Sequence, residues 1–162
     1  MQPHLRIARP VSDLARAEAQ YVDGLGLHVL GRFDGHDSFD GVMLGLDGAG
    51  WHLEFTRCRE RPALPAPTPE DLLVLYLPER DDWAQRCAQL QAAGFQPVAS
   101  ANPWWERQGR SFADADGYRV VLQHGAWPEQ GDPRPVVDYD ALEQALHWTS
   151  TYDDDQRALV SR

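Results

Sequence analysis

Two polar side chains stand two positions apart in an otherwise apolar run, Trp51-His52-Leu53-Glu54-Phe55. In an extended strand alternate residues share a face, so His52 and Glu54 would point in the same direction. A histidine beside a carboxylate can transfer protons near neutral pH. We therefore predict His52 and Glu54 as catalytic residues, with a packing or hydrogen-bonding role for His52 as the alternative.

Glu54 is open to three interpretations. A carboxylate among apolar neighbours is costly to bury unless it is paired, so it could lie at a solvent-exposed edge or form a structural ion pair with Arg9 or Arg119. It could instead anchor a ligand in a pocket, or it could bind a metal ion.

A second set of side chains has the chemistry of ligand binding. Arg119 and Gln123 alternate along one strand pattern, and Arg9 lies in another, on the same face as Ile7. A guanidinium can bind a carboxylate or phosphonate through two parallel hydrogen bonds. We predict Arg9, Arg119 and Gln123 as ligand-binding residues on the polar floor of a pocket that also holds His52 and Glu54.

Two adjacent tryptophans, Trp104 and Trp105, follow Asn102-Pro103 in a region with the composition of a turn. Such residues could simply be buried in the core or at an interface. The sharper hypothesis is that they form an aromatic wall that stacks on a planar ligand, so both are predicted ligand-binding residues.

The sequence repeats itself. The stretch 47–56 matches 114–123 in its order of Asp, Gly, aromatic, polar and apolar residues, and 13–27 matches 81–95 at nearly the same offset. Two copies of one unit predict a closed, pseudo-symmetric domain rather than an open array of repeats.

Each copy reads as strand, helix and three strands. In the first, strand alternation begins at residue 5, a helix follows the capping Ser12-Asp13, and strands are expected at 27–33, 40–46 and 51–57. In the second, a strand at 72–77 and a helix at 79–92 precede strands near 95–100, 106–113 and 118–124. The predicted fold class is α+β, with paired βαβββ modules.

The predicted domain spans residues 1–125. Its modules, 1–61 and 70–125, are joined by the proline-rich linker 62–69, which can form neither a helix nor a central strand. Residues 126–162 have no counterpart in the repeat and form a C-terminal extension, in which Asp140 could cap a short helix and 153–155 is a solvated run of aspartates.

Composition excludes several classes of function. The formal net charge is −10, which argues against nucleic acid and anionic membranes as partners. All basic residues are arginine, so a catalytic or phosphate-binding lysine is excluded. The start of the chain has no apolar run of signal-peptide length, and Cys58 and Cys87 are expected to be reduced. We expect a cytoplasmic protein.

The doubled unit, closed by His-Leu-Glu-Phe-Thr at 52–56 and by Asp-Gly-Tyr-Arg-Val-Val-Leu at 116–122, resembles the vicinal-oxygen-chelate (VOC) superfamily. This superfamily includes glyoxalase I, bleomycin-resistance proteins, extradiol dioxygenases and fosfomycin-resistance enzymes. The stretches 6–14 and 39–45 look like its YycE-like subgroup, which carries no known reaction. The resemblance covers residues 4–125.

The resemblance implies a half-barrel whose concave wall binds a divalent metal through the first and last strand of each unit. By position these ligands fall on Ile7, Glu54, Leu73 and Val121, of which only Glu54 is polar. Catalytic sites need three or more donors, so we predict that the usual metal site, and with it the cofactor, is lost.

A rebuilt metal site is the alternative to that loss. His52 and Glu54 could supply two ligands, but a third from His4 or His124 would have to reach across from the opposite face of its strand.

Two functions follow. The first is a metal-free protein that binds a small molecule in the half-barrel cleft, and the alternative is a metal-dependent lyase, isomerase or dioxygenase with a rebuilt site at His52 and Glu54. A third is a structural or interaction role for the extension. The family often builds its cleft across a dimer, which implies a homodimer.

Overall fold

The structure is a computed structural model that describes residues 3–127. The predicted helix at Asp140 and the aspartate run 153–155 lie outside the described residues. Residues 1–125 form one compact unit, and in the described part of the chain no helix is long and apolar enough to cross a membrane.

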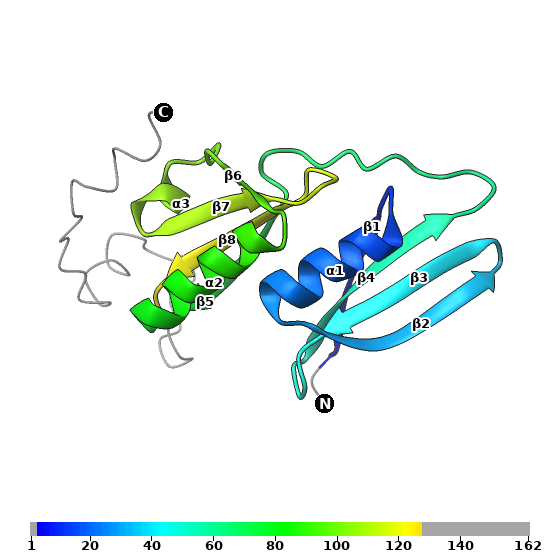
Figure 1. Ribbon diagram of the computed structural model, residues 1–162, viewed down its shortest axis with the longest axis horizontal. Coiled ribbons are helices and arrows are strands. Elements are labelled where there is room, and N and C mark those ends of the chain that lie inside the picture. The colour runs from blue at the N-terminus through cyan, green and yellow to red at the C-terminus, as the bar shows by residue number, and fades with distance from the viewer. Residues whose placement is uncertain (1–2, 128–162) are drawn as a thin grey trace. The chain divides into compact units, whose positions relative to one another are not determined.

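The predicted fold is confirmed, with two βαβββ modules that each form a four-stranded mixed sheet (Figure 1). The elements of the first module are β1 (Leu5–Pro10), α1 (Leu14–Leu25), β2 (His28–His36), β3 (Phe39–Gly45) and β4 (Trp51–Cys58). Those of the second are β5 (Leu72–Leu77), α2 (Arg80–Ala92), β6 (Gln96–Val98), α3 (Trp104–Arg107), β7 (Gly109–Ala113) and β8 (Arg119–His124).

The two sheets have the same topology. The strand order is β1-β4-β3-β2 in sheet 1 and β5-β8-β7-β6 in sheet 2. In each sheet the first strand pairs in parallel with the last, and the remaining pairs are antiparallel. Parallel strands need a long crossover connection. In each module the helix and the two middle strands together form the connection between the first and the last strand.

Helix α1 begins after the predicted capping residues and ends at a glycine. The Asp13 side chain accepts a hydrogen bond of 3.0 Å from the backbone N–H of Arg16 at the N-cap. The helix stops at Gly26, whose φ of 70° lies in the left-handed region, and the Gly26 N–H returns to the last turn.

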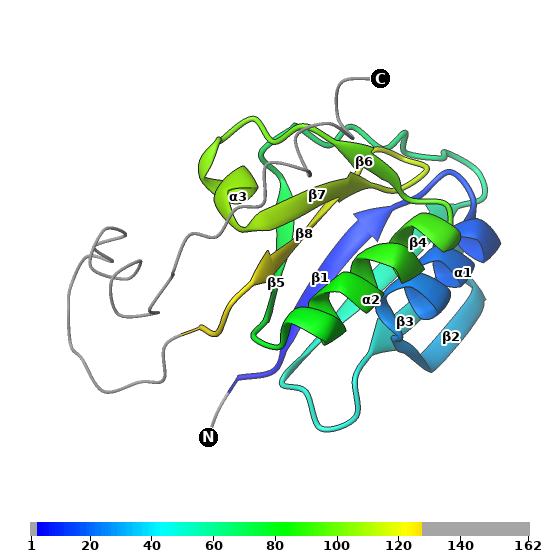
Figure 2. The ribbon, with the colours of Figure 1, turned by 60° about the vertical axis from the view of Figure 1, so that its left-hand side comes forward.

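The core lies between the helices and one face of each sheet. Alternate residues of β4, Leu53 and Phe55, are fully buried under α1, where Tyr21 packs its ring 4.7 Å from that of Phe55. Helices α1 and α2 lie side by side, as both views show (Figures 1 and 2), and join the two halves into one hydrophobic cluster.

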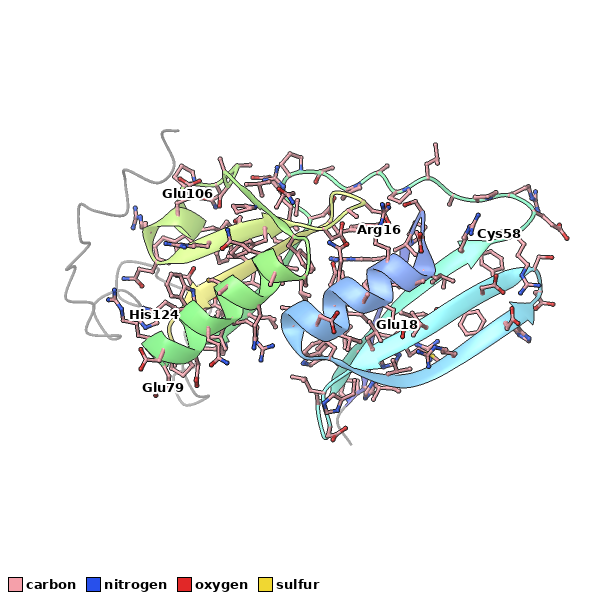
Figure 3. The ribbon with its side chains drawn as sticks, viewed as in Figure 1. Arg16, Glu18, Cys58, Glu79, Glu106 and His124 are labelled. Carbon is pink, nitrogen blue, oxygen red and sulfur yellow. The ribbon has the colours of Figure 1, made fainter. Side chains whose placement is uncertain are left out.

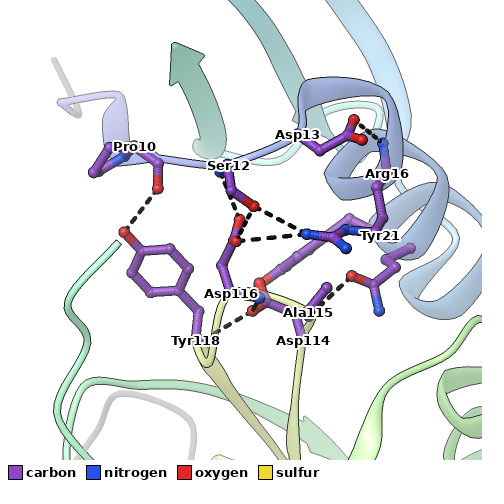
Figure 4. A network of polar contacts seen from close by, with 10 residues as sticks. Pro10, Ser12, Asp13, Arg16, Tyr21, Asp114, Ala115, Asp116 and Tyr118 are labelled. Carbon is purple, nitrogen blue, oxygen red and sulfur yellow. Dashed lines mark hydrogen bonds and ion pairs between the residues drawn. The ribbon is translucent and has the colours of Figure 1, made fainter. Parts of the chain in front are cut away.

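A polar network adds to this junction between the modules (Figure 4). The buried Asp114, at the start of the β7–β8 turn, accepts hydrogen bonds from the Tyr21 hydroxyl and from the backbone of Tyr118. Asp116 in the same turn accepts from the backbone N–H and the hydroxyl of Ser12, which precedes the N-cap residue of α1. The β7–β8 turn of the second module is thereby hydrogen-bonded to α1 of the first module and to the residues just before it.

Two element boundaries differ most from the prediction. Strand β2 continues to His36 instead of ending at 33, and it turns back through Asp37 and Ser38, which both have positive φ. The predicted strand 106–113 begins only at Gly109, because the tryptophan pair opens the single-turn helix α3. Asn102 starts that turn by accepting a hydrogen bond of 3.0 Å from the Trp104 N–H.

Candidate functional site

Sheet 1 has one face covered by α1 and one that no helix covers within residues 3–127. We call the second the open face. The pairing register assigns residues to it, since Arg6 lies opposite His52, and Ala8 and Met43 both lie opposite Glu54. The open face is formed by Arg6, Ala8, Leu30, Phe33, Gly41, Met43, Gly45, His52, Glu54 and Thr56.

Two glycines of β3 leave room on this face. A Cβ added at Gly41 would overlap the ring of Phe33, and one at Gly45 would lie 2.7 Å from the side chain of Leu30. The β2 side chains can therefore lie flat across β3. The apolar half of the open face thus borders the polar half on β1 and β4.

The polar half is a connected cluster centred on Arg6. Its guanidinium donates from Nε to His52 Nε2 over 3.0 Å and forms an ion pair from Nη1 to Glu54 Oε2, also over 3.0 Å. The other nitrogen of His52, Nδ1, is 2.7 Å from His4 Nε2, and the two rings are 4.9 Å apart.

These contacts fix the proton positions on both histidines. An arginine only donates, so His52 Nε2 must accept and the proton of the neutral ring sits on Nδ1. His52 Nδ1–H then donates to His4 Nε2, which leaves the proton of His4 on its own Nδ1. The cluster is a directed chain from Arg6 through His52 to His4.

The same surroundings oppose a positive charge on His52. Burial lowers the pKa of His52, the neighbouring Arg6 and His4 lower it further, and Glu54 acts in the opposite direction. His52 is 8% exposed, and the Glu54 side chain is 12% exposed against 55% for Arg6. The two predicted catalytic residues therefore lie beneath the guanidinium, and His52 has both ring nitrogens engaged.

The equivalent face of sheet 2 is covered by its own chain. The segment 99–109, which includes α3, lies over β7, where the Ser100 and Ser111 hydroxyls are 2.7 Å apart. The Trp105 carbonyl approaches so closely that a Cβ at Gly109 would lie 2.5 Å from it. Val121, at the centre of this face, is fully buried.

The structure does not bring all the predicted site residues together. His52 and Glu54 share the open face, as their spacing predicts. Arg119 and Gln123 share a face of sheet 2, where Arg119 Nη1 donates to the Ala99 carbonyl over 3.0 Å. Gln123 is 6% exposed, and its Oε1 has no hydrogen-bond partner among the described residues. Trp104 and Trp105 belong to the same module, and both are half-buried.

The placement of Arg9 in a pocket floor with His52 and Glu54 is wrong. Arg9 pairs with Phe55, so it lies on the face that α1 covers. Its guanidinium sits 4.7 Å from the centre of the Tyr118 ring, and its Nη1 is buried without a hydrogen-bond partner among the described residues. Ile7 is apolar and faces the core, and Arg9, two residues later in the same strand, lies on the same face.

The expectation that His4 points away from His52 is wrong for the same reason. Ile7 pairs with Leu53 on the covered face, so Arg6, and His4 two residues before it, belong to the side of His52. The signal was present, because the alternation of Leu5 and Ile7 already places Arg6 on the opposite, polar side. Arg6 is the residue of this cluster that reasoning from the sequence missed.

The pairing register also shows that two of the four positions equivalent to metal ligands are occupied by other residues than predicted. In the first strands, the residues that share a face with Glu54 and Val121 are Ala8 and Val74, not Ile7 and Leu73. Neither has a donor atom. Within residues 3–127 no group of three or more His, Cys, Asp or Glu side chains is placed to hold a metal ion. The donor set does not fit a metal of the family type, because Glu54 alone of these four positions offers a donor, and the Arg6 guanidinium already pairs with it and with His52 Nε2.

Comparison with known proteins identifies the family. Residues 5–56 match the YycE-like N-terminal domain, and residues 70–124 match the YycE-like C-terminal domain. The chain belongs to the YycE-like family. The uncharacterised protein YycE of Bacillus subtilis strain 168 is 40% identical over 120 residues, which cover 74% of this chain and 86% of that protein.

Solved structures agree with this assignment. The 2.0 Å crystal structure of a YycE protein from Bacillus subtilis, of unknown function and assigned provisionally to the glyoxalase/fosfomycin-resistance proteins, matches with a TM-score of 0.73 and 38% identity over 80% of this chain and 93% of that one. The trypanothione-dependent glyoxalase I of Leishmania major matches with a TM-score of 0.61 and 16% identity over 100% of both chains. TnmS3, an antibiotic-binding protein from Streptomyces sp. CB03234, matches with a TM-score of 0.56 and 22% identity over 78% of this chain and 98% of that one. The YycE-like chain thus has the VOC fold.

Proposed function

We propose that this YycE-like protein binds a small organic molecule on the open face of sheet 1, without a metal ion. The observation that carries the proposal is the cluster of Arg6, His52 and Glu54, three polar side chains on a sheet face whose other half is Phe33, Met43 and glycine. Apolar area with a few converging polar groups is the usual make-up of a ligand site. That TnmS3, which shares the fold, is an antibiotic-binding protein is consistent with such a role.

The metal-free part of the proposal rests on the engagement of the donors. A divalent ion bound to His52 Nε2 and Glu54 would have to displace Arg6 from the histidine, and the positive charges of the ion and of a guanidinium paired with Glu54 repel each other. The alternative function, a metal-dependent enzyme with a rebuilt site, requires that displacement.

A fragment screen in the presence of a chelator tests the proposal. Compounds that raise the melting temperature of the full chain are then titrated against Arg6→Gln. We expect at least a roughly tenfold loss of affinity, because this variant removes the guanidinium on which the cluster is centred. Arg32→Gln is the matched control, since Arg32 pairs with Glu18 on the covered side of the same sheet (Figure 3 labels Glu18).

Two outcomes would contradict the proposal. Binding that appears only after Mn²⁺, Fe²⁺ or Zn²⁺ is restored would favour the metal-dependent enzyme. Compounds whose affinity is lost in Trp105→Ala but kept in Arg6→Gln would move the site to α3 in the second module, as the aromatic-wall hypothesis has it.

We also propose that the protein is a cytoplasmic homodimer. Cys58 and Cys87 are both free thiols, the form that a reducing compartment maintains. A second copy could supply an opposite wall for the open face, as the superfamily resemblance implies. Sedimentation of the full chain tests the dimer, and a monomer at micromolar concentration would contradict it.

A further inference from the structure

The ligand of the open face is constrained by the hydrogen-bonding groups that the cluster leaves unused. Arg6 uses Nε on His52 and Nη1 on Glu54, and its Nη2 has no contact among the described residues. Half of the Arg6 side chain is exposed. The guanidinium therefore retains N–H donors at the surface of the face.

His4 adds a second donor. Because its Nε2 accepts from His52, the neutral ring of His4 carries its proton on Nδ1. His4 is exposed, and no contact to its Nδ1 is present within residues 3–127. The series of hydrogen bonds that runs from Arg6 through His52 thus ends at the Nδ1–H of His4, which can donate to a ligand.

Both imidazole acceptors of the cluster are used internally, since His52 Nε2 accepts from Arg6 Nε and His4 Nε2 accepts from His52. Glu54 is paired with Arg6 through Oε2, and its side chain is 12% exposed against 55% for Arg6, so the N–H donors are the groups that a ligand meets first. A ligand that offers acceptors would meet two sets of N–H groups.

We propose that Arg6 and His4 together bind an oxyanion of the ligand, a carboxylate or phosphonate, and that His52 is a positioning residue that holds His4 in the donating tautomer. This inference rests on the proposed function and names its ligand class. It also reassigns His52, which cannot act as a free base while both of its ring nitrogens are engaged. The ligand's oxyanion is recognised by charge and by hydrogen bonds of the stronger, charge-assisted kind.

The first measurement concerns the unliganded protein. Long-range ¹H–¹⁵N correlation spectra report which imidazole nitrogen carries the proton. We expect the Nδ1–H form for both His4 and His52 in the full chain, and a mixture of tautomers for both in Arg6→Gln. A wild-type His52 with its proton on Nε2 would overturn the directed chain.

The second measurement uses benzoate and benzamide, a pair of one shape that differs in charge and in acceptor capacity. In wild type we expect benzoate to shift the His4 and Arg6 signals and to bind at least roughly tenfold more tightly than benzamide. Arg6→Gln should abolish this preference. Arg32→Gln should retain it, because Arg32 is similarly exposed but pairs with Glu18 on the covered side of sheet 1.

The outcomes separate the two proposals. If benzamide binds to these residues as tightly as benzoate, or if Arg6→Gln keeps the preference, the oxyanion inference is wrong and small-molecule binding at the open face stands. If neither compound perturbs the signals of the open face while fragments bind elsewhere, both proposals fail. His52→Gln tests the positioning role, and an unchanged benzoate affinity with an unchanged His4 tautomer would contradict it.

Discussion

The two modules are copies of one unit, yet their non-helical faces have been put to different uses. In sheet 2 this face is filled by Val121, Ser111 and the segment that carries α3, so little of it reaches solvent. In sheet 1 the same face carries a charged cluster, and nothing between residues 3 and 127 lies over it as α3 lies over β7. The second module thus covers the non-helical face of its own sheet, whereas the first module leaves the same face available for the proposed ligand.

The turns that precede the last strand of each module, β4 and β8, also differ, but here it is the turn of the second module that makes the more extensive contacts. Asp114 of the second module is buried and hydrogen-bonded to Tyr21 of α1. Asp47, its counterpart in the repeat, is 86% exposed, and its side chain contacts His28 at 3.4 Å and no other described residue. In the proposed function the first module therefore supplies the binding surface, and the turn of the second module attaches the two modules to each other. Each can be changed separately.

The largest effect is expected at Asp114. Asp114→Ala removes the acceptor for Tyr21 and for two backbone N–H groups of the turn, and we expect a loss of about 3 kcal/mol in the free energy of unfolding. Asp47→Ala should cost less than about 0.5 kcal/mol. Urea unfolding of both variants measures this contrast.

Asp114→Asn refines the same comparison. Burial raises the pKa of Asp114, so its charge is costly, while an amide keeps one oxygen for the two backbone donors. Asparagine should therefore recover part of the stability lost in the alanine variant. Equal losses for Asp47→Ala and Asp114→Ala would show that the attachment does not depend on this turn.

The next effect concerns the glycine that shapes the open face. In Gly41→Ala the new methyl would overlap the Phe33 ring and should destabilise the protein by about 1–3 kcal/mol. Gly50→Ala is the control, because a Cβ there meets nothing within 4 Å. Thermal unfolding compares them, and an unaffected Gly41→Ala protein would mean that Phe33 does not lie across β3.

The fold could be predicted from the sequence because its signals are local. Asp13 before α1, Gly26 after it and the alternation in β4 each specify a short stretch, and two copies of the unit constrain each other. The one-turn helix at Trp104 escaped prediction because four residues carry no helical periodicity.

The candidate site was predicted only in part. His52 and Glu54 lie on one strand, where their spacing sets the face. Arg6 and His4 enter through the pairing of β1 with β4, strands that are separated by most of the module. The register of a parallel pair depends on how the core packs, and a shift of one residue exchanges the faces, which is how Arg9 was mistaken for a neighbour of Glu54.

A smaller effect is expected from pH, and it should be confined to the open face. The folded pKa of His52 is below its usual value of 6.5. As pH falls below about 6.5, the unfolded chain takes up a proton that the folded chain resists, so the free energy of unfolding should fall, by at most about 1.4 kcal/mol per pH unit. His52→Gln should remove this dependence between pH 7.5 and 5.5.

His28→Gln is the control for this measurement, since the His28 side chain is 60% exposed at the surface of the same module. The comparison is made as the difference between each variant and wild type at every pH, so that titration shared by all three proteins cancels. A pH profile of His52→Gln that is parallel to wild type would contradict a neutral, constrained His52.

The smallest effect concerns reactivity rather than stability, and it uses the one cysteine in each module. Burial raises the pKa of the Cys87 thiol to about 11, so almost no thiolate exists at pH 7.5. Cys58, labelled at the end of β4 in Figure 3, is only half-buried. In native protein we expect the single thiol of Cys87→Ser to react with an aromatic disulfide at least roughly 100-fold faster than that of Cys58→Ser. Both thiols should react alike in urea. Comparable native rates would mean that the core of the second module, where Cys87 packs, opens often enough to expose its thiol as readily as the end of β4 exposes Cys58.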